Sequence, residues 1–350
     1  MELFQPNNLS RLRPEFTPLN DSALLSLVGS LLREHYVLPD ASSIRLAQFV
    51  GPNVASRNLR VELGDDLYFL KSRAADKYDA LAAEAELGAR LAEMGVQAPR
   101  VKRTVNGEFV SLHGGSCWAL YAFEDGDYFS GKRSELDEAA KTFVELTRAA
   151  STLFNDRARP SGGSEDSFLE ELAPLLDQGV ASANPEINNL CKSHRTNILI
   201  HLQRVRSKRS LVELQTLPLH LDYHPLNLIM RQGKVRCILD LEHLKQYPTP
   251  AGLGFAAYKL IRQVMVDASI RAQELSQPSL VERWLEPWHG SFPQPRYNAM
   301  ELGLGAIYRV LALIHLILSA SLKRGDDRST YDLEKQIGSL YEIDVIFGGR

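Results

Sequence analysis

The sequence has few cysteines and no excess of charge of one sign. Its three cysteines, Cys117, Cys191 and Cys237, are widely spaced in 350 residues. An odd, scattered set excludes a disulfide framework and a cysteine-ligated zinc cluster, and it favours a reducing compartment. The 40 basic and 43 acidic residues leave a formal charge of −3. That balance gives no electrostatic reason to bind nucleic acid or an anionic membrane.

Long apolar segments are also missing. The first 16 residues lack the apolar core of a secretory signal. The most apolar stretch, residues 310–322, contains His315 and is too short to cross a bilayer, so we expect it to be a buried helix. These features predict a soluble cytoplasmic protein that binds neither nucleic acid nor membrane. They do not indicate an oligomeric state.

What the sequence does contain is typical of a globular protein with a large core. It is 44% hydrophobic and 24% charged, which excludes disordered and coiled-coil classes, and its length is enough for two domains. The patterns before residue 124 predict one early helix, a strand-rich region and a second helix, at residues 22–32, 44–50, 59–63, 67–71, 80–94, 101–105, 108–112 and 117–123.

The composition changes at the acidic segment of residues 124–127, after which the pattern is mostly helical. One short strand pair interrupts it, at residues 226–230 and 235–239, around a Gln-Gly-Lys turn. Strands and helices that are segregated along the chain predict the α+β class. We expect two domains: residues 1–124, a helix plus a β sheet, and residues 125–350, a larger helical part.

Residues 219–242 contain the most informative polar side chains. Asp222 and Asn227 are five residues apart across a proline-containing loop, and Asp240 ends the returning strand. The hairpin therefore brings Asp240 back towards Asn227. An amide oxygen and a carboxylate form a hard-oxygen site suited to Mg²⁺, which retains waters and binds substrate phosphates. A second carboxylate, Asp222, could orient and deprotonate an attacking hydroxyl.

This segment resembles the catalytic loop and metal-binding hairpin of the aminoglycoside phosphotransferase and choline kinase superfamily. The shared pattern is His220, Asp222, four residues, Asn227, two short strands and Asp240, with an acid, Glu242, two places on. The resemblance implies a two-lobed protein-kinase-like fold, with a small antiparallel β lobe, a larger mostly helical lobe, and ATP and Mg²⁺ as cofactors. It makes Asp222 the catalytic base and Asn227 and Asp240 the Mg²⁺ ligands, while His220 supports the loop and Glu242 is a further candidate for metal or substrate.

Weaker matches to the same family lie in the first domain. Lys71 resembles the lysine that pairs with nucleotide phosphates, and either Glu84 or Glu86 would be its carboxylate partner. The turn at residues 51–58 resembles the nucleotide-covering hairpin. The remaining nucleotide contacts that the resemblance implies are Ser56 and Asn58 for the phosphates, and the main chain from Ala122 to Glu124 for adenine.

The chain also departs from the family pattern. Leu221 stands where glycine is usual, which is tolerated if its φ is negative. After Glu242 an acid-containing segment of the family is absent, and there is no multi-glycine phosphate loop.

We expect an ATP- and Mg²⁺-dependent phosphotransferase that acts on a hydroxyl of a small metabolite. The segments at residues 118–126 and 240–244 look most like those of the N-acetylhexosamine kinase group, so a sugar or amino sugar is the first expectation. Homoserine, amino alcohols and aminoglycosides stay open. The alternative is a nucleotide-binding pseudokinase or regulator without transfer activity. A protein-modifying kinase or nucleotidyl transferase of the same fold is a further rival, although no Ala-Pro-Glu segment is present.

Overall fold

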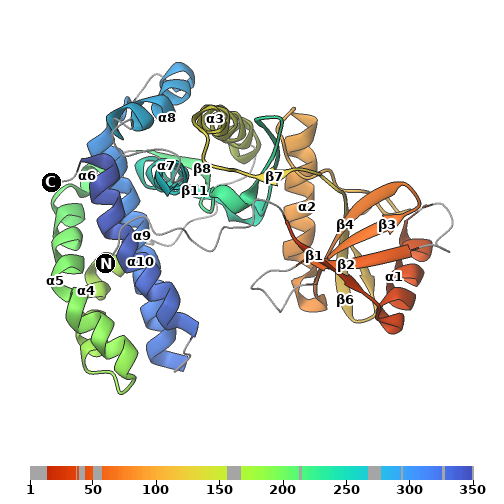
Figure 1. Cartoon of the computed structure of the whole chain (residues 1–350), viewed down its shortest axis with the longest axis horizontal. Helices are drawn as coiled ribbons and strands as arrows, with labels where there is room; N and C mark the ends of the chain where they lie inside the picture. Colours follow the sequence, from red (N-terminus) through yellow and green to blue (C-terminus); the bar gives the residue numbers. More distant parts are fainter. Residues whose placement is uncertain are drawn as a thin grey trace. The chain divides into compact units, whose positions relative to one another are not determined.

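The chain packs into two compact units (Figure 1). The computed structural model describes residues 14–36, 38, 44–49, 57–155, 167–212, 215–266, 277–292, 295–324 and 328–348. The described residues of the sheet unit lie within Asn8–Ser130 and Leu226–Glu242, and those of the helical unit lie within Gly131–Pro225 and His243–Arg350. These units are defined by packing. The predicted domains, 1–124 and 125–350, are defined by expected function, and that boundary stays a prediction.

The sheet unit is built on six antiparallel strands in the order β1-β2-β3-β4-β6-β5. The strands are β1 (Phe16–Leu19), β2 (Ile44–Phe49), β3 (Asn58–Leu63), β4 (Asp66–Ala74), β5 (Ser111–His113) and β6 (Ser116–Ala122). β4 lies between β3 and β6, so that Lys71 is paired with Asn58 on one side and with Ala119 on the other. A central strand of this kind is held by hydrogen bonds along both edges, which fixes its side chains in position.

Alternation along the strands gives the sheet two apolar faces. In β6, Trp118 and Leu120 pack in the cluster formed by helix α1 (Ser22–His35), whereas Cys117 and Ala119 pack in the cluster formed by helix α2 (Tyr78–Glu93). Successive strand residues point to opposite faces, so the two helices cover opposite sides of the sheet (Figure 1). The carboxylate of Asp21 caps α1 by accepting hydrogen bonds from two main-chain amides.

A second, three-stranded sheet completes the sheet unit. Its order is β10-β9-β7, with β7 (Asp127–Tyr128), β9 (Leu228–Arg231) and β10 (Lys234–Ile238). Gln232 and Gly233, which join β9 to β10, both have positive φ, the pattern of a type I′ turn. The amide of Ile238 donates to the carbonyl of Gln97 at 2.8 Å. The late hairpin is thus attached to the part of the chain that carries the six-stranded sheet.

The helical unit is formed by long helices around one core. Its elements are α3 (Arg133–Asn155), α4 (Ser167–Val180), α5 (Pro185–Ser207), α6 (Arg209–Val212), α7 (Thr249–Val266), α8 (Gln277–Ser291), α9 (Ala299–Arg324) and α10 (Arg328–Phe347), with the strand pair β8 (Thr216–His220) and β11 (Leu244–Pro248). Helices α7 and α9 approach closely, because Gly254 and Gly305 leave room for carbonyl groups of the opposite helix, where a Cβ would overlap.

Helix α9 is long and apolar enough to span a membrane by length and composition alone, over Ala299–Lys323. However, 61% of its most apolar window is buried inside the protein. Val310, Leu311, Ile314 and Leu318 are fully buried. The predicted burial of this segment is therefore confirmed, and α9 serves as a core helix.

Two parts of the strand prediction are wrong. Residues 101–105 and 108–112 do not pair as a hairpin; Val101 forms only an isolated bridge with Tyr121, and β5 begins at Ser111. The Asn-Gly turn does form, with Gly107 at φ +82° and its amide donating to Thr104. The preceding chain hydrogen-bonds elsewhere: the amide of Lys102 donates to Leu120. The turn signal was correct, but tertiary contacts determine where its flanking segments bind.

Candidate active site

Lys71 lies on the face of the sheet that α2 covers. In β4, Tyr68 and Leu70 belong to the α1 cluster, and the alternating residues Phe69, Lys71 and Arg73 point the other way. Lys71 and Arg73, two residues apart on β4, therefore both point towards α2. Both lie close to the carboxylate of a single helical residue.

That residue is Glu84, which lies three residues after the buried Leu81 and so on the same face of α2. Lys71 Nζ is 2.7 Å from Glu84 Oε1, and Arg73 Nη2 is 3.2 Å from Glu84 Oε2. The side chains of Lys71 and Glu84 are only 10% and 9% exposed, respectively. Glu86, the open alternative, leaves the helix about 200° further round. The geometry selects Glu84 as the carboxylate that contacts Lys71.

The same cations also reach two acids of the late hairpin. Lys71 Nζ lies 3.7 Å from Asp240 Oδ1, and Arg73 is paired with Glu242. Arg73 was not among the predicted site residues, although its place two residues after Lys71 on one strand could have indicated it. The five charges sum to −1, because two cations face three carboxylates. A cluster with this balance can accept a further cation.

Asp240 and Asn227 are neighbours through the main chain. The amide of Leu239 donates to the carbonyl of Asn227 at 2.8 Å, so the residue that follows Leu239 returns to the level of Asn227. Asp240 has φ +54°, a left-handed conformation that aspartate tolerates better than most residues. Its side chain is 46% exposed, so its oxygens are accessible. Carboxylate and amide oxygens are a donor set that fits Mg²⁺.

The charge of Asp240 also affects the pKa of Tyr128, which lies in β7. Burial, with a smaller contribution from the negative charge of Asp240, raises the pKa of Tyr128 to about 12. The hydroxyl of Tyr128 therefore stays protonated at neutral pH.

Of the other predicted nucleotide contacts, Asn58 lies beside Lys71, whereas Ala122 and Glu124 already have partners within the protein. Asn58 is directly opposite Lys71 in the β3–β4 ladder, so both side chains leave the same face, and its buried Oδ1 has no hydrogen-bond partner among the residues that the structure describes. An orphaned buried amide oxygen beside a lysine is consistent with a missing ligand. Ser56 lies outside the described residues. The amide of Ala122 already donates to Arg100 at 2.9 Å, and the Glu124 carboxylate is paired with Arg100 and Arg236. A nucleotide contact from this segment would have to use other main-chain groups.

Asp222 follows strand β8 in the helical unit. Its amide donates to His220 Nδ1 at 3.2 Å, and His220 is buried, as its expected structural role requires. The next residue, Tyr223, is fully buried and donates its hydroxyl to the carbonyl of Ala139 at 2.9 Å. Leu221 is not among the described residues with positive φ, so it fits the position where glycine is usual. The loop that carries Asp222 is fixed on both sides.

The carboxylate of Asp222 is surrounded by histidines. Burial alone would raise its pKa, but a hydrogen bond and positive charge from His224, with the charges of His243 and His220, hold the pKa well below its usual range. His224 Nε2 lies 3.3 Å from Asp222 Oδ2. Asp222 is therefore a charged acceptor at neutral pH. His224 was not among the predicted site residues, and its place beside Asp222 follows from the shape of the loop.

A lysine in α7 is a second cation that sequence patterns did not single out. Lys259 Nζ lies 4.9 Å from the ring centres of Phe255 and Tyr258. Burial, with the positive charges of Lys335 and Arg262, lowers its pKa to about 7, although Glu342 and Asp222 act in the opposite direction. Lysines on apolar helix faces are usually assigned to solvent, so no periodicity would have found this one.

Known structures share this fold over nearly their whole length. A spectinomycin phosphotransferase, APH(9)-Ia, in complex with ADP and spectinomycin, is 11% identical; the match covers 95% of this chain and 98% of that one, with a TM-score of 0.64. An aminoglycoside phosphotransferase from Alicyclobacillus acidocaldarius is 14% identical, with coverage of 95% and 96% and a TM-score of 0.62. An ethanolamine kinase from Plasmodium vivax is 12% identical, with coverage of 94% and 90% and a TM-score of 0.57. No curated protein sequence matches the chain.

These similarities confirm the predicted fold class, an α+β protein with an antiparallel sheet in the N-terminal part and a mostly helical C-terminal part. The model of a family described as the phosphotransferase enzyme family matches residues 47–288, which is more than half of the chain. The match confirms the predicted enzyme class, a phosphotransferase, and the predicted family resemblance. The chain belongs to the phosphotransferase enzyme family.

Proposed function

We propose that this protein transfers the γ-phosphoryl group of ATP to a hydroxyl group of a small metabolite. The observation that carries the proposal is the ion-pair network of Lys71, Glu84 and Asp240 in a chain of the phosphotransferase family. Phosphoryl transfer needs little covalent chemistry from the protein and depends on positioning and charge neutralisation. The cytoplasm is the compartment that we propose, because ATP is available there.

The roles follow from the charges. Lys71, oriented by Glu84, binds phosphate oxygens as a point charge. Asn58, beside it on the same face, can hydrogen-bond the same group. Asp222, kept ionised by its histidines, orients the acceptor hydroxyl and takes its proton late in the reaction. A carboxylate with such a low pKa is a weak base, which suits a loose transition state in which the hydroxyl loses its proton late.

Asn227 and Asp240 would hold Mg²⁺. The donor set fits a hard cation, as does the negative balance of the charges around Lys71 and Arg73. A bound Mg²⁺ would supply positive charge that offsets the negative charge of the phosphate oxygens. Lys71 keeps Asp240 in a fixed position at 3.7 Å before any ligand arrives.

The acceptor is proposed to be a neutral or anionic polyhydroxyl compound, with a sugar first and an N-acetylated amino sugar next. A cationic acceptor would need acidic side chains in the helical unit. Two acids of α4 in that unit are already paired, Glu170 with Arg206 at 3.2 Å and Glu171 with His315 at 3.1 Å. Lys259 adds positive charge to the surroundings of Asp222. These charges disfavour an aminoglycoside or an amino alcohol.

The test is ATP consumption with Mg²⁺ in the presence of panels of sugars, amino sugars, amino alcohols and aminoglycosides. We expect stimulation by a compound of the first two panels. Asp222→Asn should lower kcat at least about 100-fold, because a positioned base contributes that much, and nucleotide binding should be retained. Asp240→Ala should abolish Mg²⁺-dependent nucleotide binding. The exposed Asp332→Asn serves as the matched control and should leave both unchanged.

The competing function is nucleotide binding without transfer, as in a pseudokinase or regulator. It predicts thermal stabilisation by MgATP with no turnover on any acceptor and equal behaviour of Asp222→Asn and the wild type. Retention of both Asp222 and the Lys71–Glu84 pair favours transfer, because a purely binding module does not need a base.

A further inference from the structure

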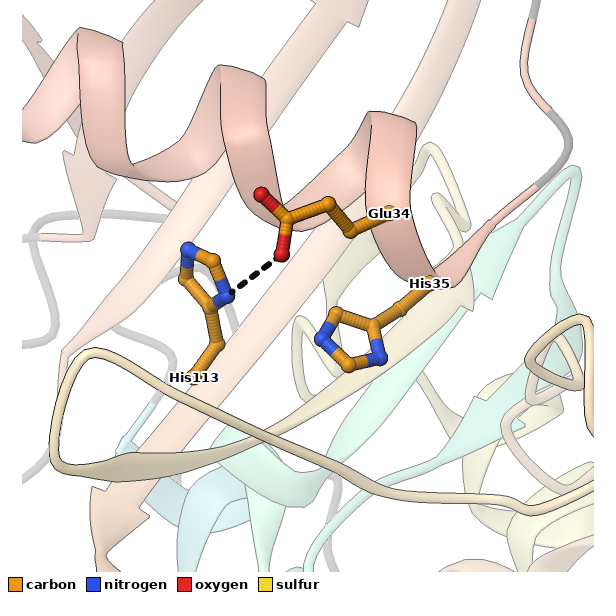
Figure 2. A group of neighbouring side chains, drawn as sticks. All are labelled: Glu34, His35 and His113. Carbon is orange, nitrogen blue, oxygen red and sulfur yellow. Dashed lines mark ion pairs between the residues drawn. The ribbon is translucent and has the colours of Figure 1, made fainter.

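Three metal-ligating side chains converge on the α1 side of the sheet, which is opposite the face that carries Lys71. Glu34 and His35 are the last residues of the final turn of α1, and His113 ends β5 (Figure 2). His113 Nδ1 lies 3.6 Å from Glu34 Oε2, and the rings of His35 and His113 are 5.6 Å apart at 81°. One ligand atom from each of the three lies within 4.8 Å of the others.

The hydrogen bonds of His113 determine which ring nitrogen carries its proton. Ser30 Oγ donates its single hydrogen to the carbonyl of Leu27 at 3.0 Å. With that hydrogen used, we assign the ring N–H of His113 Nε2 as the donor in its 2.8 Å contact with Ser30 Oγ. In the neutral ring, Nδ1 is then an unprotonated acceptor that faces a carboxylate oxygen. Two acceptors that face each other favour a proton or a metal ion between them.

Rigid contacts hold both histidines in place. The indole of Trp118 donates to the carbonyl of His113 at 3.0 Å, and the amide of Val105 donates to the carbonyl of His35 at 2.8 Å. Gly114, directly after His113, has φ +57°, and a Cβ there would lie 2.5 Å from Leu27 of α1. The turn can approach α1 this closely because residue 114 has no side chain.

We propose that Glu34, His35 and His113 bind a divalent transition-metal ion, with Zn²⁺ as the best fit and water as the fourth ligand. Two imidazoles and one carboxylate suit Zn²⁺ and not Mg²⁺. In a tetrahedral zinc site, ligand atoms are about 3.4 Å apart. The 3.6 Å contact already meets that spacing, and Glu34, 60% exposed, is free to adjust. The Nε2–H of His113 donates to Ser30, the support that a metal-binding histidine typically has.

This site would connect the end of α1 to the edge strand β5 and so clamp the helix to the sheet. It is separate from the residues assigned to phosphotransfer, since His113 is opposite Ser116 in the ladder and on the face of Trp118. A ligand that binds only the folded state stabilises it in proportion to the logarithm of its concentration over Kd. The expected role is structural, with no effect of the metal on the chemistry of transfer.

The experiment measures Zn²⁺ binding to the full chain, freed of metal by a chelator, through competition with a chromophoric chelator and through thermal unfolding. We expect one tight site and a rise in Tm that Mg²⁺ does not produce. His113→Ala and His35→Ala should abolish the site. Ser30→Ala, which keeps all three ligands, should weaken binding about 10- to 100-fold. This milder variant keeps the test valid if a histidine variant fails to fold.

The matched control is His315→Ala. His315 is also paired with a glutamate, Glu171 at 3.1 Å, but the two belong to no third-ligand group among the described residues. This variant should retain the zinc stoichiometry. The proposal is overturned if Zn²⁺ does not bind, if Ser30→Ala binds as tightly as the wild type, or if His113→Ala retains the site. In the first case Glu34 and His113 would simply share a proton.

Discussion

His224 Nε2 lies 3.3 Å from Asp222 Oδ2, and this contact sets the charge of the proposed base. The pKa of Asp222 is held below its usual range by His224, His243 and His220, against the effect of burial. A depressed carboxyl pKa keeps the ionised form available as the pH falls, and ionisation is lost only when the pH passes below the folded-state pKa.

His224→Ala should therefore raise the pKa of Asp222 and move the acid limb of the kcat–pH profile to higher pH. We expect a loss of about tenfold at neutral pH, from one charge-assisted hydrogen bond, and a larger loss in acid. His315→Ala, which removes another carboxylate-paired histidine, should leave the profile unchanged. An unshifted acid limb in His224→Ala would show that His224 does not tune Asp222.

Glu84 is placed between two cations, so its charge should matter more than that of its neighbours. Glu84→Gln removes the compensation of Lys71 and Arg73, which are mostly buried. Lys71 would then be drawn to Asp240 alone, and we expect kcat/KM for ATP to fall about 10- to 100-fold, equivalent to one or two charge-assisted hydrogen bonds. Glu86→Gln, two residues along the same helix, is the control and should behave as the wild type. An equal fall of kcat/KM in Glu84→Gln and Glu86→Gln would show that Glu84 has no special role.

The local part of this site could be predicted from the sequence because it depends on the repeat of side-chain direction within one strand or one helix. Alternation in β4 and helical spacing in α2 place Lys71 and Glu84 on facing surfaces. The hairpin that turns at Gln232 and Gly233 brings the main chain next to Asp240 back to Asn227. The turn-forming residues alone are enough to predict this hairpin. Such features depend on residues a few positions apart, where steric rules are strong.

Long-range pairings could not be predicted in this way. Arg73 meets Glu242 across 169 residues, and no local pattern connects them. The strand β8 contains Pro218, which argues against a strand, yet it pairs with β11 as a two-stranded sheet in which proline is tolerated. The group of Glu34, His35 and His113 likewise has no motif, since β5 brings His113 to α1 only through tertiary packing.

Tyr223 anchors the loop of Asp222, and its hydroxyl can be removed without changing the ring. Its bond to the carbonyl of Ala139 is buried. Tyr223→Phe should lower the free energy of unfolding by about 1–2 kcal/mol, because the loss of a buried hydrogen bond leaves an acceptor less well satisfied. Urea unfolding of the wild type and Tyr223→Phe measures this change in the free energy of unfolding. Tyr331→Phe is the control, since Tyr331 is 68% exposed and should change stability by less than about 0.5 kcal/mol. A neutral Tyr223→Phe would mean that packing of the ring alone holds the loop.

Lys259 should make stability depend on pH in the neutral-to-alkaline range. Burial, with the charges of Lys335 and Arg262, lowers its pKa to about 7, against the effects of Glu342 and Asp222. The unfolded chain has the ordinary lysine pKa of about 10.4, so between these values the unfolded state binds more protons and stability rises with pH. Relative to Lys259→Met, the wild type should gain up to about 1.4 kcal/mol per pH unit between pH 7 and 10.

Urea unfolding of the wild type and Lys259→Met at several pH values measures this difference. Below pH 7 the difference should be constant and should favour the methionine variant, because the wild type must then bury a charge against Phe255 and Tyr258. Lys245→Met, at an exposed position of β11, should show no pH-dependent difference. The prediction fails if the stability difference between the wild type and Lys259→Met does not change with pH. The ammonium of Lys259 would then retain its ordinary pKa, because attraction to the two rings and to Asp222 offsets the cost of burial.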